Sequence, residues 1–233
     1  MPVDSSADFP FASASFEGGI SSLPTRRRPT IYERVGKRVV DTALVVLLLP
    51  LVLPLMALIA LMIAASGQMP FYRHRRVGQN GAAFDCLKFQ TMVPDAEARL
   101  QALLAADTEA AQQWERNQKL TNDPRITRLG RFLRSSSLDE LPQLFNVLRG
   151  DMSLVGPRPV TSDELARYNA AADVILRLRP GITGIWQVEC RGRSSGYEDR
   201  VLFDLVYYDG VGLGTDLRLL WRTVGAVLRR TGQ

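Results

Sequence analysis

Residues 134–159 read RSSSLDELPQLFNVLRGDMSLVGPRP. Two adjacent acids, Asp139 and Glu140, lie near the start of a helix that the pattern predicts over Leu138–Arg149. A carboxylate at the positive end of a helix can stay ionised, attack a phosphorus atom or hold a divalent metal ion. A capping box between Ser137 and Glu140 is a competing structural explanation for the pair.

Cations surround this acidic pair in the sequence. Arg134 precedes it, Arg158 follows between two prolines, and Lys88 ends an earlier predicted strand. A phosphorylated substrate needs positive groups around the attacked atom, and an arginine fixed by prolines suits a bidentate phosphate contact. Each cation alone could be a surface charge, but the three together favour an anionic substrate.

One long apolar segment, Val39–Ala65, lies near the N-terminus. An apolar helix of this length can cross a bilayer of roughly 30 Å. Pro50 and Pro54 predict a kink in its middle. Basic residues flank both ends, which favours keeping both ends on the cytoplasmic side. The sequence therefore predicts a re-entrant membrane helix, with a plain transmembrane helix as the alternative.

The whole pattern predicts an α+β fold that is mostly helical. Three parts are expected: a disordered cytoplasmic tail over 1–30, the re-entrant membrane helix over 31–68, and a catalytic domain over 69–233. A β-hairpin is predicted from Phe71–Val77 and Ala83–Phe89 around Asn80-Gly81. Further helices are predicted over 94–119 (with a break near Asp107), 127–134, 138–149, 161–178, 197–208 and 213–230. The last is basic and amphipathic, and it suits either the membrane interface or the domain core.

Composition excludes several classes of protein. The formal net charge of +5 suits anionic lipids or phosphorylated substrates, and no nucleic-acid-binding motif is present. The two cysteines, Cys86 and Cys190, form neither a disulfide framework nor a zinc motif. Glycines 181 and 184 could present backbone amides to a phosphate, but they lack the lysine and spacing of a P-loop.

Three ordered motifs, over 122–127, 137–159 and 179–188, carry a family resemblance. The chain resembles the bacterial sugar transferase family, the monotopic phosphoglycosyl transferases, over Arg34–Gly232. The resemblance implies transfer of a sugar-1-phosphate from a UDP-sugar to undecaprenyl phosphate, with UMP as the first product. It implies that Asp139 is the nucleophile and that Glu140 serves a magnesium ion, Mg²⁺.

The same resemblance places Lys88, Arg134 and Arg158 at basic substrate-binding positions. A further loop arginine falls on Arg191, with Arg193 as the alternative. The chain departs from the family in having Leu53-Pro54 where the family has Ser-Pro, and Gln90 where it has arginine.

The subtype most similar to this chain starts exopolysaccharide repeat-unit assembly with galactose phosphate. Glucose or an N-acetylated amino sugar stays open as the donor sugar, and a non-enzymatic adaptor of polysaccharide export is the alternative function. The resemblance also implies a bacterial inner-membrane location with the catalytic domain on the cytoplasmic face, downstream glycosyltransferases as partners, and room for a homodimer.

Overall fold

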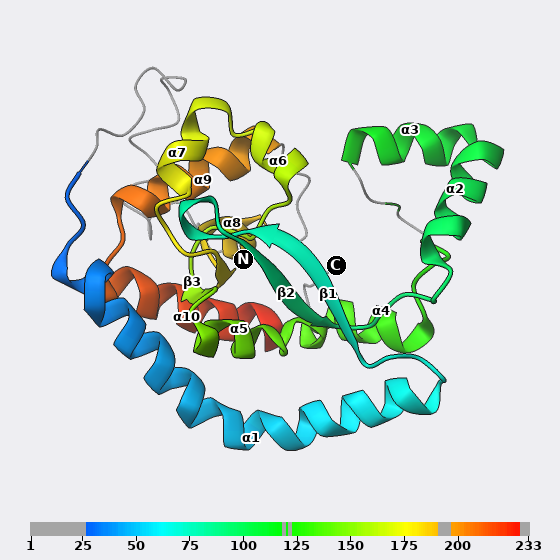
Figure 1. Cartoon of the computed structure of the whole chain (residues 1–233), viewed down its shortest axis with the longest axis horizontal. Helices are drawn as coiled ribbons and strands as arrows, with labels where there is room; N and C mark the ends of the chain where they lie inside the picture. Colours follow the sequence, from blue (N-terminus) through cyan, green and yellow to red (C-terminus); the bar gives the residue numbers. More distant parts are fainter. Residues whose placement is uncertain (1–26, 118–119, 121–122, 191–196, 229–233) are drawn as a thin grey trace, which may run out of the picture.

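A computed structural model describes residues 27–117, 120, 123–190 and 197–228. It is mostly helical, as the sequence predicts, and it contains the predicted hairpin and a second small sheet that was not predicted (Figure 1). The helices are α1 Lys37–Ala65, α2 Ala96–Ala106, α3 Thr108–Asn117, α4 Arg128–Ser135, α5 Gln143–Arg149, α6 Ser162–Ala166, α7 Ala172–Ile175, α8 Ile185–Glu189, α9 Tyr197–Asp209 and α10 Leu213–Leu228. The strands are β1 Phe71–Val77, β2 Ala83–Phe89, β3 Ser153–Val155 and β4 Gly181–Thr183. Most of the predicted tail lies outside the described residues.

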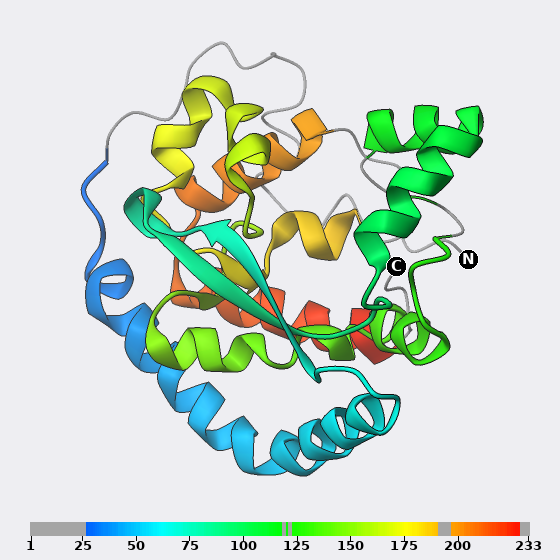
Figure 2. The same ribbon diagram turned by 45° about the vertical axis from the view of Figure 1, so that its right-hand side comes forward.

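Helix α1 is the long apolar helix expected from the sequence. It continues through Pro50 and Pro54, and its ribbon changes direction in the middle third, where both prolines lie (Figure 2). One side packs on the domain through Val45, Met56 and Ile63. The opposite side leaves a row of apolar side chains exposed, and only 17% of its most apolar window is buried.

Strands β1 and β2 form the predicted hairpin. Phe71 pairs with Phe89 and Val77 pairs with Ala83. Asn80, at φ 56°, and Gly81, at φ 79°, make the turn, which explains the Asn-Gly signal. Side chains alternate between the two faces of the hairpin, so β2 directs Cys86 and Lys88 to one face and Leu87 to the other.

Two predicted helices are interrupted. The segment 161–178 contains α6 and α7, separated where Asn169 adopts φ 48°. The segment 138–149 begins as a 3₁₀ turn, and α5 starts only after Pro142. The predicted break near Asp107 is confirmed, because α2 and α3 meet there.

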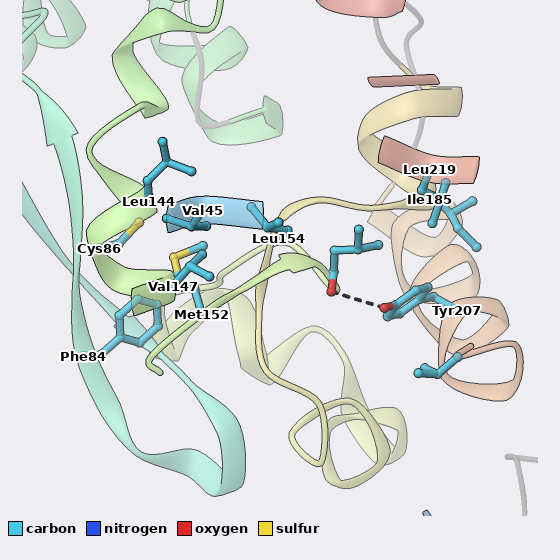
Figure 3. Close-up of a cluster of buried hydrophobic side chains, with 12 residues drawn as sticks. Val45, Phe84, Cys86, Leu144, Val147, Met152, Leu154, Ile185, Tyr207 and Leu219 are labelled. Carbon is cyan, nitrogen blue, oxygen red and sulfur yellow. Dashed lines mark hydrogen bonds between the residues drawn. The ribbon is translucent and has the colours of Figure 1, made fainter. Parts of the chain in front are cut away.

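Strands β3 and β4 are parallel, and they cross the centre of the domain. The main hydrophobic core packs around them and joins α1, β2, α5, α8, α9 and α10 (Figure 3). Tyr207 of α9 lies in this core and donates a hydrogen bond to the carbonyl of Val155 at 3.2 Å. The core thereby fixes the segment after β3, which carries Arg158.

Candidate active site

The acidic pair lies in a 3₁₀ turn, Leu138–Glu140, just before α5. The predicted capping box is wrong: Ser137 adopts φ 58°, and its side chain makes no capping hydrogen bond. Pro142 supplies the physical reason, because it has no N–H to continue a helix from Leu138. The turn directs Asp139 into the domain and leaves Glu140 half-buried at its surface.

Glu140 is held between two of the predicted cations. Lys88 Nζ donates to Glu140 Oε1 at 2.7 Å, and Arg158 Nη1 lies 3.7 Å from the same oxygen. Lys88 comes from β2, Glu140 from the 3₁₀ turn, and Arg158 from the segment between β3 and α6. Three elements that are distant in sequence therefore meet at one carboxylate.

Asp139 is buried, with 8% of its surface exposed. Burial raises the pKa of its carboxyl to about 6, and the Lys88 and Arg134 charges oppose this rise. Arg134 is itself fixed by Thr91, to whose hydroxyl its Nε donates at 2.9 Å. At neutral pH Asp139 is therefore largely an ionised carboxylate with little water around it, which suits a nucleophile.

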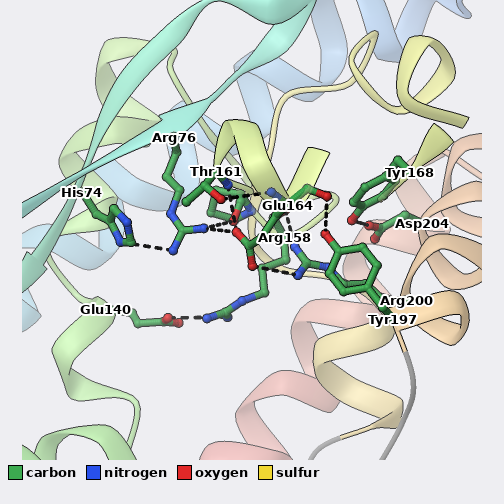
Figure 4. A network of polar contacts seen from close by, with 11 residues as sticks. His74, Arg76, Glu140, Arg158, Thr161, Glu164, Tyr168, Tyr197, Arg200 and Asp204 are labelled. Carbon is green, nitrogen blue, oxygen red and sulfur yellow. Dashed lines mark hydrogen bonds and ion pairs between the residues drawn. The ribbon is translucent and has the colours of Figure 1, made fainter. Parts of the chain in front are cut away.

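A second polar network contacts the backbone of Arg158 (Figure 4). Glu164 accepts from Arg76 at 2.5 Å and closes a capping box with Thr161. Arg200 Nη1 lies 3.7 Å from Glu164, and its Nη2 donates to the carbonyl of Arg158 at 3.1 Å. The network thus links the hairpin, α6 and α9 to the backbone that carries Arg158.

Glycines allow two backbone segments next to Arg158, around Gly156 and Gly181, to pack closely. A Cβ on Gly181 would lie 2.1 Å from the amide nitrogen of Gly156, so only glycine fits. The Gly181 amide donates to the carbonyl of Pro157 at 2.7 Å. The predicted use of this amide for phosphate binding is therefore wrong, because the fold already occupies it.

The space between these side chains is small. The hollow lined by Lys88, Glu140, Gln143 and Arg158 has a volume of about 10 Å³, which holds about one water molecule. Lys88 and Arg158 line this hollow, so an anion larger than water would meet both side chains there. Both side chains are long and flexible enough to exchange Glu140 for that anion.

The donor set suits a magnesium ion only together with a phosphorylated substrate. Within the described ranges no group of three or more His, Cys, Asp or Glu side chains forms a metal cluster. Mg²⁺ commonly takes one or two carboxylates and completes its shell with substrate phosphates and water. Glu140 beside Asp139 fits that arrangement, with Glu140 the more accessible ligand.

The fold brings together four of the predicted site residues, Lys88, Asp139, Glu140 and Arg158. Arg134, the fifth, lies beside them. Arg191 and its alternative Arg193 lie outside the described residues. The sequence prediction missed Arg76, Glu164 and Arg200. Strand alternation would have placed Arg76 on the same hairpin face as Lys88. No sequence signal pairs Glu164 with Arg200, because that contact depends on tertiary packing.

Fold and site together define a small helical domain that carries a pair of acids flanked by cations, beside one long apolar helix. The chain belongs to the bacterial sugar transferase family, since the model of that family, described as "Bacterial sugar transferase", matches residues 32–230. The match includes every described residue of the site.

Several curated proteins are similar to this chain. It is 47% identical to the undecaprenyl-phosphate galactose phosphotransferase of Salmonella typhimurium and 46% identical to the UDP-galactose-lipid carrier transferase of Erwinia amylovora. Each match covers 85% of this chain and 42% of the relative, so the chain spans less than half the length of these relatives. The exopolysaccharide production protein ExoY of Sinorhizobium fredii is 44% identical, with 85% of this chain and 88% of that protein covered.

Proposed function

We propose that this protein is an enzyme that transfers a sugar-1-phosphate from a UDP-sugar to undecaprenyl phosphate. The observation that carries the proposal is the buried Asp139 carboxylate next to Glu140, which is held by Lys88 and Arg158. Membership of the sugar transferase family and the names of the similar proteins support the same substrates.

Asp139 performs the first step. Its carboxylate oxygen attacks the sugar-bearing phosphorus of the UDP-sugar, and the bond from that phosphorus to the bridging oxygen breaks. UMP leaves with the electron pair, and the sugar phosphate stays on Asp139 as an acyl phosphate. A phosphate oxygen of undecaprenyl phosphate then attacks the same phosphorus, which releases Asp139 and forms undecaprenyl-diphosphate-sugar.

The cations stabilise the phosphates during both steps. Lys88 and Arg158 leave Glu140 and bind the diphosphate of the donor, which places positive charge where negative charge develops. Arg134 keeps Asp139 ionised from the other side. Glu140 would hold Mg²⁺, and the ion would supply charge neutralisation for the substrate phosphates when bound.

The membrane places the lipid acceptor at this site. The exposed apolar side of α1 and the basic residues at both of its ends support a re-entrant helix anchored from the cytoplasmic face of the bacterial inner membrane. Helix α10 adds Leu217, Trp221 and Val224, which are 49%, 80% and 55% exposed. Such side chains suit the interface between headgroups and acyl chains.

Galactose is the proposed donor sugar, because similar proteins are named for galactose. Glucose and N-acetylated amino sugars are the alternatives. The similarity to ExoY supports a place at the first step of exopolysaccharide repeat-unit assembly, where glycosyltransferases would extend the product. A homodimer is compatible with this function.

The test is UMP release by the purified protein in nanodiscs with Mg²⁺, undecaprenyl phosphate and a panel of UDP-sugars. We expect UMP from one donor, and its loss in Asp139→Asn but not in Asp173→Asn, which neutralises an exposed acid on α7. No UMP from any donor, with folded protein and an active control transferase, would favour the export adaptor instead.

A further inference from the structure

A second hollow lies on the hairpin face that points away from Lys88. It has a volume of about 340 Å³, within the range of ligand sites, and it lies between the hairpin and α5. We call it the hairpin groove, and it is lined by the apolar side chains Phe71, Leu87, Pro142 and Phe145 and by Arg73 and Arg149. Because strand residues alternate between faces, this groove is separate from the active site.

The charge of the hairpin groove is positive. Asp85 also lines it, but the Asp85 carboxylate faces Arg75, whose Nη1 lies 3.3 Å away. The side chains of Arg73 and Arg149 are exposed and make no hydrogen bond or ion pair with any residue that the structure describes. Two arginine side chains therefore remain available to an anion.

The apolar wall of the groove continues into the surface of the long apolar helix. Phe71 stacks on Phe89 with ring centroids 5.5 Å apart. Phe89 is buried in a cluster with Met56 and Ile63 of α1, and Phe145 packs against the same cluster. A molecule in the groove would thus contact both apolar side chains that adjoin the α1 cluster and two arginine side chains.

We propose that the hairpin groove binds one anionic phospholipid of the surrounding bilayer. Its phosphate lies between Arg73 and Arg149, and the first part of an acyl chain lies on Phe71 and Phe145. Arginine suits this role because its planar group forms paired hydrogen bonds to phosphate oxygens, and basic pockets beside membrane helices bind acidic headgroups. The inference rests on the proposed membrane placement of α1, but it does not depend on the transfer reaction.

The experiment counts retained lipids by native mass spectrometry. The full chain is reconstituted with equal amounts of phosphatidylglycerol and phosphatidylcholine and is then released into a mild detergent. We expect one retained phosphatidylglycerol per chain. The preference over phosphatidylcholine should fall about thirtyfold in the double variant Arg73→Gln/Arg149→Gln.

The matched control is Arg128→Gln/Arg131→Gln, which removes two exposed arginines from α4 and should keep the preference. Leu87→Trp is a second variant that fills the groove without changing charge, and it should release the lipid. Equal retention by wild type and the groove variants, or equal loss in the α4 control, would overturn the proposal.

Asp139→Asn separates this inference from the proposed function. It should abolish UMP release and still retain phosphatidylglycerol as wild type does. A wild-type protein that retains phosphatidylglycerol selectively but turns over no donor would overturn the transfer reaction alone. Turnover without any lipid preference would sink the groove alone.

Discussion

Asp139 combines two properties that oppose each other. In the proposed reaction the carboxylate must be ionised to attack phosphorus, yet it is buried, and burial favours its neutral form. Lys88 and Arg134 compensate for part of this cost, but the pKa stays raised from 3.8 to about 6. The ionised form of Asp139 therefore destabilises the fold, as the proposed catalytic role would allow.

This opposition predicts a pH-dependent effect of Asp139→Asn on stability. The folded protein binds a proton at Asp139 more tightly than the unfolded chain does, so the wild-type carboxyl loses stability as pH rises from about 3.8 to about 6. Asparagine has no charge to bury. The variant should gain stability relative to wild type over this range, up to about 3 kcal/mol above pH 6, since each pKa unit corresponds to about 1.4 kcal/mol.

The measurement is the unfolding midpoint of both proteins in detergent at pH 4.5 and pH 7.5. Asp173→Asn serves as the control, because it replaces an exposed carboxylate by the same amide. A difference between Asp139→Asn and wild type that shrinks with rising pH would show that the burial of Asp139 does not govern its ionisation.

At the scale of single residues, the sequence identified the centre of the site but not its support. The acidic pair and its cations are distinctive as residue types in an ordered motif, so Lys88, Asp139 and Arg158 could be predicted. Glu164 and Arg200 act through contacts between α6 and α9. A charged residue on an amphipathic helix looks the same in sequence whether it faces water or supports a neighbour.

At the scale of elements, short sequence motifs predicted the structure correctly where one or two residues determine the backbone conformation. Asn80-Gly81 specified the hairpin because few residues adopt positive φ there. Periodicity failed over 161–178, where apolar residues recur at helical spacing but Asn169 adopts a left-handed conformation. Asparagine tolerates that conformation better than most residues, yet it also occurs in regular helices, so the sequence alone did not reveal the break.

One buried network joins three helices and gives a prediction at this scale. Asp216 of α10 accepts from Lys37 of α1 at 2.6 Å, from Tyr207 of α9 at 2.7 Å and from Tyr32 at 2.6 Å. Asp216→Asn would leave the buried Lys37 with the nearby Asp41 and the face of the Tyr207 ring, 5.7 Å away, to offset its charge. Breaking a buried pair from one side typically costs 3–5 kcal/mol, and we expect about 3 kcal/mol here because Asp41 remains.

Thermal unfolding measures this cost, with an expected loss of roughly 6–12 °C in midpoint for a chain of this size. Tyr207→Phe removes one hydroxyl from the same network and should cost about 1 kcal/mol. Asp209→Asn, an exposed acid at the end of α9, is the matched control. Equal midpoints for Asp216→Asn and Asp209→Asn would mean that the network does not hold α1 to the domain.

At the scale of the whole molecule, α1 is the element that would set the orientation of the protein relative to a membrane. Its exposed side presents Leu47 and Leu51, which are 78% and 76% exposed, and α10 presents Trp221 at 80%. Contiguous apolar surface of this extent marks a binding or membrane surface in a soluble domain. The sequence predicted the helix from its length and composition, but its direction relative to a bilayer depends on the bend.

Pro50 and Pro54 give a prediction about the side of the membrane on which each end of α1 lies. Each proline inside a helix removes a hydrogen bond, costs about 3 kcal/mol relative to alanine and favours a kink at its position. With Pro50 and Pro54 present, both ends of α1 should lie on the cytoplasmic side. In Pro50→Ala/Pro54→Ala the helix should straighten, and its C-terminal end should then reach the opposite side of the membrane.

Labelling with a membrane-impermeant maleimide measures the two positions in a Cys190→Ser background, where Cys86 is buried and unreactive. Arg34→Cys and Met69→Cys both replace exposed residues at the two ends of α1. In inverted inner-membrane vesicles both should label, whereas intact spheroplasts should label neither. The alanine pair should move only the Met69→Cys signal to the spheroplasts. Labelling of Met69→Cys from the outside while both prolines are present would establish a spanning helix instead, because its two ends would then lie on opposite sides of the bilayer.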